Sequence, residues 1–121
     1  MDKKQVGNWC DALKDAWMAK DFERIAGIFP KTSLYYEDPF STPGTTTGEI
    51  VAYWDEIVHQ EINNLLIEPM VIEGFRATLH WYIDYRDIRD SSIYIMDGVY
   101  LVEFNECMEC IFFKQWWVIK E

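Results

Sequence analysis

The chain has 121 residues, which suits one domain whose core buries about two thirds of the unfolded surface. Half of the residues are hydrophobic and 17% are aromatic, so a disordered chain is excluded and there is more apolar surface than one small core needs. The formal net charge of -10, from 21 acidic and 11 basic residues, disfavours binding to nucleic acid or to an anionic membrane.

Nothing in the sequence predicts a membrane segment or a leader. No apolar run approaches the ~20 residues that a helix needs to cross a bilayer. The polar start of the chain leads into no signal-peptide core. We therefore expect residues 1–121 to form one domain in the cytoplasm.

Cysteine and histidine give no clear metal or redox motif. Three cysteines, an odd number, argue against a secreted disulfide framework. Cys107 and Cys110 have the spacing of a redox or zinc pair but lack a second pair of ligands, and the alternative is one turn cysteine and one buried strand cysteine. His59 and His80 lie far apart, with no acidic residue at ligand spacing. We therefore expect no metal site and no cofactor.

The N-terminal part of the sequence has the periodicity of helices. Apolar residues spaced about one turn apart predict an amphipathic helix over about residues 5–19: Val6, Cys10, Leu13 and Trp17. Asp21 then caps a second, short helix that ends before Pro30, because proline cannot continue it. The residues of this helix that we expect in the core are Phe22, Ile25, Ile28 and Phe29.

A strand is predicted next, ending at Asp38. Tyr35 and Tyr36 favour an extended backbone, and Pro39 keeps Asp38 away from helical angles. Asp38 is then a carboxylate flanked by aromatic residues at a strand end, where pockets usually open. It is a candidate general base.

A third helix follows a turn-rich loop at residues 41–45. Thr46 and Glu49 have the spacing of a capping box and predict where this helix begins. Its apolar residues are Ile50, Tyr53, Trp54 and Ile57.

From about Leu65 the pattern changes to four long antiparallel strands, separated by turn signals at residues 73–74, 87–92 and 105–106. Alternation makes one face of the sheet apolar, while the other face still carries aromatic side chains. If helices cover the first face, the second is an exposed apolar patch, which normally marks an interface. We expect a homodimer through this outer face, formed by Thr78, His80, Tyr82, Phe112, Trp116 and Val118.

The order of these elements resembles the cone-shaped α+β fold of the nuclear transport factor 2 superfamily, a cystatin-like fold with three N-terminal helices packed on a curved antiparallel sheet. Tyr36-Glu37-Asp38-Pro39 resembles the segment that holds the general base of ketosteroid isomerase. Residues 98–104 and the pattern from Cys110 to Trp117 are similar to the final hairpin of SnoaL-like members. The resemblance covers nearly the whole chain.

The resemblance implies Asp38 as the catalytic base but does not supply both oxyanion donors. The family tyrosine of the first helix meets Leu13, and the family's protonated aspartate meets Tyr100. Leu13 has no proton to donate, and one donor is typically worth about 2.7 to 4 kcal/mol, which argues against steroid isomerisation. Tyr100 can still polarise a carbonyl group. The alternative role for Asp38 is to cap the turn that Pro39 begins.

We expect an aromatic-lined cavity between the first and third helices and the concave sheet. Its candidate ligand-binding residues are Trp17, Tyr36, Tyr53, Trp81, Tyr100, Phe113, Gln115 and Trp117. For Tyr36 the alternative is a place in the core. For Tyr100 and Gln115 it is a hydrogen bond to each other. The aromatic residues could also simply pack together without a ligand.

Two classes of function remain open. The first is a small enzyme of the isomerase or polyketide cyclase type, with Asp38 acting as general base on an apolar, carbonyl-bearing molecule. The second is a non-catalytic module for binding an apolar ligand or for dimerisation. The absent donor at Leu13 favours binding, or a chemistry other than steroid isomerisation.

Overall fold

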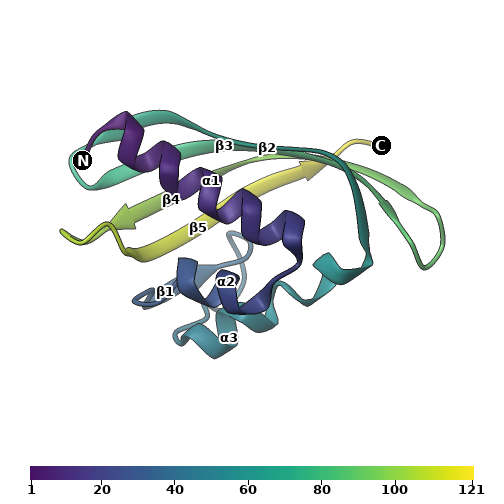
Figure 1. Cartoon of the computed structure of the whole chain (residues 1–121), viewed down its shortest axis with the longest axis horizontal. Coiled ribbons are helices and arrows are strands. Elements are labelled where there is room, and N and C mark those ends of the chain that lie inside the picture. Colours follow the sequence, from purple (N-terminus) through teal and green to yellow (C-terminus); the bar gives the residue numbers. More distant parts are fainter.

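In the computed structural model, which describes residues 1–121, the chain has an α+β fold with three α-helices, one short 3₁₀ helix and a five-stranded sheet (Figure 1). The elements follow the predicted order. Their bounds are Lys3–Ala19 (α1), Phe22–Ile28 (α2), Leu34–Tyr36 (β1), Thr47–Ala52 (α3), Asp55–His59 (η1, the 3₁₀ helix), Gln60–Glu73 (β2), Arg76–Asp87 (β3), Ile93–Phe104 (β4) and Cys110–Ile119 (β5). None of the helices is both long enough and apolar enough to span a bilayer.

A capping box fixes the first turn of α1. The Asp2 carboxylate accepts a hydrogen bond from the Gln5 N–H (2.8 Å), and the Gln5 side chain accepts one from the Asp2 N–H (2.9 Å). The helix ends at Lys20, whose φ of 53° is left-handed. Its buried face includes the residues that the periodicity predicted: Val6, Cys10, Leu13 and Trp17.

The other two helices begin where the sequence predicted. Asp21 caps α2 by accepting hydrogen bonds from two N–H groups of its first turn. Thr46 caps α3 by accepting one from the Glu49 N–H (3.2 Å). The third helix ends early, at Ala52, and the chain continues into η1. Trp54 and Ile57 are both buried, and their spacing of three residues is one turn of a 3₁₀ helix, so the change of helix type brings both into the core.

The strand order of the sheet is β1-β5-β4-β3-β2. Strands β2 to β5 form the predicted antiparallel meander, although β2 begins earlier than expected, at Gln60. The sheet as a whole is mixed, because β1, which lies outside the predicted four-strand meander, pairs parallel with β5. Strand β1 also stops at Tyr36 rather than at Asp38.

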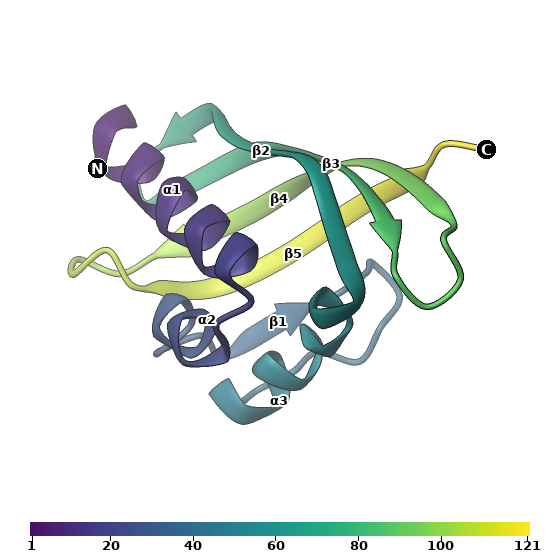
Figure 2. The same ribbon diagram turned by 45° about the vertical axis from the view of Figure 1, so that its right-hand side comes forward.

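The three helices lie on one face of the curved sheet (Figure 2). Two rows of residues cross this inner face: Leu79, Tyr100 and Gln115 in one, and Trp81, Gly98 and Trp117 in the other. Gly98 has a steric role, because a Cβ there would lie 2.6 Å from the Trp81 Nε1 and still closer to the Trp116 carbonyl oxygen. Glycine therefore lets the Trp81 indole lie flat against the sheet.

The outer face of the sheet carries the six residues of the expected interface. Strand register places Thr78, His80 and Tyr82 in rows that end, on β5, at Lys114, Trp116 and Val118. The exposed fraction is 41% for Trp116 and 69% for Val118. His80 lies between two carboxylates, 3.0 Å from Asp97 and 3.4 Å from Glu68, and its hydrogen bond to Asp97 raises its pKa. The outer face is therefore mixed, with an apolar part along β5.

Candidate functional site

A pocket of about 200 Å³ opens between α1, η1 and the inner face of the sheet, and we call it the Glu37 pocket. Eight of its 15 lining residues are aromatic, two are acidic and none is basic. The aromatic residues are Trp17, Tyr35, Tyr53, Trp54, Trp81, Tyr85, Tyr100 and Trp117, and the acidic ones are Glu37 and Glu56. The pocket is thus an apolar cleft with an excess of negative charge.

The structure brings six of the eight predicted ligand-binding residues to this pocket. These are Trp17, Tyr53, Trp81, Tyr100, Gln115 and Trp117. Tyr36 and Phe113 do not line it, and neither does the predicted base, Asp38.

The direction expected for Tyr36 is corrected by the pairing of β1 with β5. Successive side chains of a strand point to opposite faces. Tyr35 lies opposite Phe113 and stacks on it, with 4.6 Å between ring centroids, so Tyr35 is the residue that points inward. Tyr36 lies on the outer face, where its ring packs against Phe112 and the Lys114 ammonium group.

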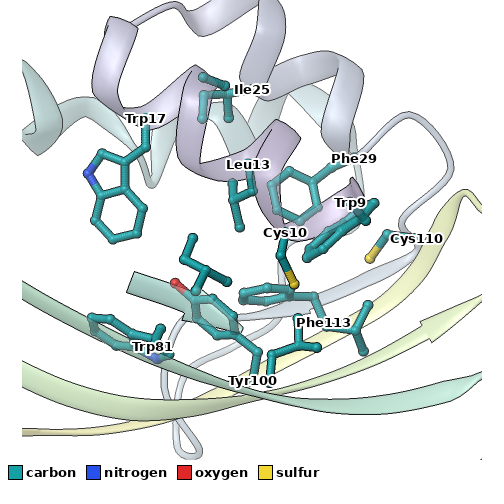
Figure 3. Packing of buried hydrophobic residues seen from close by; sticks show 14 of the residues in the cluster. Trp9, Cys10, Leu13, Trp17, Ile25, Phe29, Trp81, Tyr100, Cys110 and Phe113 are labelled. Atoms are coloured by element: carbon teal, nitrogen blue, oxygen red, sulfur yellow. The ribbon is translucent and has the colours of Figure 1, made fainter. Parts of the chain in front are cut away.

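Phe113 and Leu13 belong to the packed core beneath the pocket, and both are fully buried (Figure 3). Phe113 also contacts the ring of Phe29, with 5.4 Å between centroids. Leu13 projects from α1 toward the sheet. The resemblance implies a tyrosine donor at this position in the family, and Leu13 has no proton to donate.

Asp38 forms the turn that was the alternative to its catalytic role. Its carboxylate accepts a hydrogen bond from the Phe40 N–H at 2.8 Å, and its carbonyl oxygen accepts one from the Ser41 hydroxyl at 3.1 Å. The side chain borders a separate groove on the outer face, next to Asp97 and Trp116. The expected position of Asp38 inside the cavity is therefore corrected.

Glu37 is the carboxyl group that enters the pocket. It follows Tyr35 by two residues and shares its inward direction. Partial burial, together with the negative charges of Asp38 and Asp55, raises the pKa of Glu37 to about 7. Its carboxylate forms no ion pair or hydrogen bond within the chain, while its backbone carbonyl accepts a hydrogen bond from the Trp117 Nε1 at 3.3 Å. Glu37 is thus held by its backbone and left free at its carboxyl group.

Tyr100 and Gln115 bring uncommitted polar groups to the same pocket. The two are opposite each other in the sheet, yet no hydrogen bond joins them, so the alternative of mutual pairing does not hold. The Tyr100 hydroxyl points away from the sheet toward α1, beside Trp17 and Trp81 (Figure 3). Burial raises the pKa of Tyr100 well above its ordinary value, so the hydroxyl stays protonated and can donate.

Some of the other polar side chains of the pocket are already paired, whereas the buried indole nitrogens of Trp54 and Trp81 have no hydrogen-bond partner. Trp17 donates from its indole nitrogen to the Gln60 side chain at 2.8 Å. Glu56 pairs with Arg89 at 2.6 Å, and Arg89 also binds Asp87 at 2.8 Å. These hydrogen bonds with Arg89 lower the pKa of Asp87 to about 2. The Arg89 guanidinium is therefore engaged outside the pocket.

The structure contains no group of three or more His, Cys, Asp or Glu side chains that could hold a metal ion. Cys107 lies exposed in the turn before β5, and Cys110 is buried in that strand. The two are not joined by a disulfide bond. This arrangement is the turn-and-strand alternative to a redox pair.

Several lining residues were missed by the sequence analysis, above all Glu37, Tyr35 and Trp54. Strand alternation carried part of the signal, since Tyr35 and Tyr36 cannot both face the pocket. The choice between them depends on how β1 pairs with β5, which the sequence pattern does not contain. Trp54 was assigned to the third helix as core, and it is both buried and part of the pocket wall.

No protein-family model matches the chain, and no curated protein matches it in sequence. Solved structures do match, and the fold is that of nuclear transport factor 2-like and ketosteroid isomerase-like proteins. A Mycobacterium tuberculosis protein in complex with estradiol-17beta-hemisuccinate has a TM-score of 0.78 and 9% identity, covering 97% of this chain and 98% of the other.

Two further matches illustrate the range of proteins with this fold. A Catenulispora acidiphila protein with a ketosteroid isomerase-like fold, in complex with trimethylamine, has a TM-score of 0.70 and 12% identity, covering 89% of this chain and 83% of the other. SalBIII, an epoxide hydrolase/cyclase-like enzyme in pyran ring formation in polyether salinomycin, has a TM-score of 0.72 and 12% identity, covering 96% and 89%. At these identities the matches establish the fold alone.

Proposed function

We propose that the Glu37 pocket binds an apolar, carbonyl-bearing small molecule and that Glu37 removes a proton from the carbon beside the carbonyl group. The observation that carries the proposal is an unpaired carboxyl group in an aromatic pocket, with a pKa of about 7. General bases work best when their pKa lies near the operating pH. In this proposal Glu37, and not Asp38, is the general base.

Tyr100 is the group that we assign to the carbonyl oxygen. As the C–H bond breaks, its proton passes to the Glu37 carboxylate and its electron pair moves toward the carbonyl oxygen, which becomes an enolate. The protonated Tyr100 hydroxyl donates a hydrogen bond to that oxygen. Glu37 then returns the proton to the same carbon or to another one, so the step needs no co-reactant.

The size of the pocket limits the buried part of the ligand. A cavity of roughly 150 Å³ can hold a benzene molecule, so about 200 Å³ suits a single ring with small substituents. The exposed edge of Trp117 at the rim leaves room for a longer molecule to extend outward. The similar structures that hold a steroid derivative or act as a cyclase-like enzyme support a small-molecule role in general terms.

The second candidate is a binding protein without catalysis. Leu13 favours it, because an enolate would then have one hydroxyl donor, Tyr100, where the resemblance implies two donors. The loss of one donor typically costs about 2.7 to 4 kcal/mol of transition-state stabilisation.

Hydrogen–deuterium exchange distinguishes the two candidates. Proton NMR in deuterated buffer would follow exchange beside the carbonyl group in a panel of one-ring ketones. We expect exchange above the solvent rate, a loss of about 10²-fold or more in Glu37→Gln, and a nearly native rate in Asp38→Asn. Exchange that survives Glu37→Gln would contradict Glu37 as the base. If saturation-transfer NMR detects binding of the ketones but no hydrogen–deuterium exchange occurs, the second candidate, a binding protein without catalysis, would be favoured.

We also propose that two copies of the chain pair through the outer sheet face. Trp116 and Val118 expose much of their surface there, and the Lys114 ammonium group packs over the rings of Tyr36 and Trp116. One self-complementary patch is sufficient for a two-fold dimer.

A further inference from the structure

The charge balance of the Glu37 pocket limits which ligands it can accept. Two carboxylates and no basic side chain line the pocket, and Asp55 adds negative charge next to Glu37. A ligand with a carboxylate or phosphate would meet repulsion and lose its hydration without gaining a positively charged partner. The pocket therefore selects against anions.

Of the two lining carboxylates, only Glu37 lacks a protein partner. Glu56 is neutralised by Arg89, which also holds Asp87. No lysine or arginine reaches Glu37, and a partly buried carboxylate without a counterion is unfavourable when charged. A positively charged ligand would supply the counterion that the chain does not.

The aromatic wall is suited to such a ligand. A cation is attracted to the face of an aromatic ring, and tryptophan gives the strongest attraction. Four of the lining residues are tryptophans, and four more are tyrosines. A quaternary ammonium ion combines a positive charge with an apolar surface, so it can enter this pocket at a lower cost of dehydration than a small, strongly hydrated cation.

From this combination we infer that the Glu37 pocket is a binding site for small quaternary ammonium ions, with the Glu37 carboxylate as counterion and the aromatic side chains as a cage. A molecule of the size of choline fits the volume of about 200 Å³, since a cavity of roughly 150 Å³ holds benzene. This binding does not depend on proton transfer by Glu37.

Binding of the cation should depend on pH. The titratable groups around Glu37 are Tyr35 on β1, Tyr53 after α3, Asp55 and Glu56 in η1, Tyr85 on β3 and Tyr100 on β4, and Asp38 adds its charge from outside the pocket. In the free chain the Glu37 carboxyl group has a pKa of about 7, and a bound cation favours its charged form and lowers that pKa. Affinity for the cation therefore rises as the pH increases through about 7, while the charge of a quaternary ammonium ion stays constant.

Three ligands of similar shape test the inference by calorimetry and ligand-observed NMR: choline, the neutral isostere in which carbon replaces the nitrogen (dimethylbutanol), and the related anion dimethylbutanoate. Above the pKa of Glu37 we expect choline to bind at least about tenfold more tightly than dimethylbutanol, and the anion to bind most weakly. The preference should shrink below that pKa.

Variants separate the counterion from the cage. Glu37→Gln should remove the preference for choline and its pH dependence. Asp38→Asn, outside the pocket, should keep the preference and move its pH dependence to lower pH, because the Asp38 charge helps to raise the pKa of Glu37. Trp117→Leu at the rim should weaken choline by about two- to fivefold with Glu37 still present. Near-native unfolding temperatures would show that each variant is folded. Equal binding of choline and dimethylbutanol, or a preference that survives Glu37→Gln, would overturn the inference. Ketone exchange without choline binding would overturn it and leave the proposed function standing.

Discussion

Glu37 and Asp38 are neighbours in the chain, yet their carboxyl groups lie in different surroundings. Asp38 accepts a hydrogen bond from the Phe40 N–H and completes a turn on the outer side. Glu37 lies inside an aromatic pocket without a partner, and its pKa rises to about 7. A difference of one residue in the chain thus decides which carboxylate is available for chemistry.

Stability at different pH values should report this burial. The folded-state pKa of Glu37, about 7, lies above its ordinary value of 4.5, so between these two values the folded chain binds a proton that the unfolded chain releases. The stability that this gives is fully present below pH 4.5 and is lost as the pH rises through about 7. Because Glu37 is partly exposed, solvent screening reduces the effect.

Urea unfolding of the native chain and of Glu37→Gln, on both sides of this pH window, would measure the effect. We expect the native chain to lose stability relative to the variant as the pH rises. A stability difference that is the same at both ends of the window would contradict the raised pKa.

The sequence pointed to the tetrapeptide that borders the pocket, but the side chain that enters the pocket is Glu37 and not the expected Asp38. Local signals located a strand end with carboxylates, because proline and paired tyrosines act within a few residues. The inward direction of Tyr35 comes from stacking on Phe113, far away in sequence. A shift of one residue in a strand reverses every side chain, so the local pattern could not decide between Glu37 and Asp38.

At the scale of elements, Gly98 is the position where β3, β4 and β5 depend most closely on one another. An added Cβ would lie 2.6 Å from the Trp81 Nε1 and would also collide with the Trp116 carbonyl oxygen. We expect Gly98→Ala to lower the free energy of unfolding by about 1 to 3 kcal/mol, as overpacked cores do.

Gly7 in α1 is the matched control, because an added Cβ there meets nothing within 4 Å. Gly7→Ala should raise the free energy of unfolding by roughly 0.5 to 1 kcal/mol, since alanine is the better helix former. Thermal or urea unfolding would measure both variants. Equal effects of the two substitutions would show that the close approach at Gly98 has no energetic role.

The elements that the sequence predicted well are those with strong local signals. The caps at Asp21 and Thr46 and the alternation of the long strands are readable within a few residues. The parallel pairing of β1 and the change from α3 to η1 were not predicted. Both depend on packing against distant parts of the chain, which overrides local preference.

At the scale of the whole molecule, the proposed dimer can be tested by one charge. Trp116 lies in the same row of the outer face as His80, and burial of this face could involve on the order of 800 Å² per subunit. We expect the native chain to be a dimer at micromolar concentration and Trp116→Glu to be a monomer, because the substitution places an unpaired charge in the interface.

Light scattering would give the mass of each form. Met18→Glu, an exposed position on α1, is the control and should remain dimeric. A native monomer would end the dimer proposal. A dimer that survives Trp116→Glu would place the interface on another surface.

An NMR titration would show whether Glu37 is the acid–base group of the pocket. The side-chain carboxyl carbon signals would be followed from acidic to neutral pH, and the Glu37 signal identified by its loss in Glu37→Gln. We expect this signal to titrate near pH 7, well above the 4.5 of an ordinary glutamate. A Glu37 midpoint near 4.5 would contradict the account, because the carboxyl group would then be solvated rather than buried in the aromatic pocket.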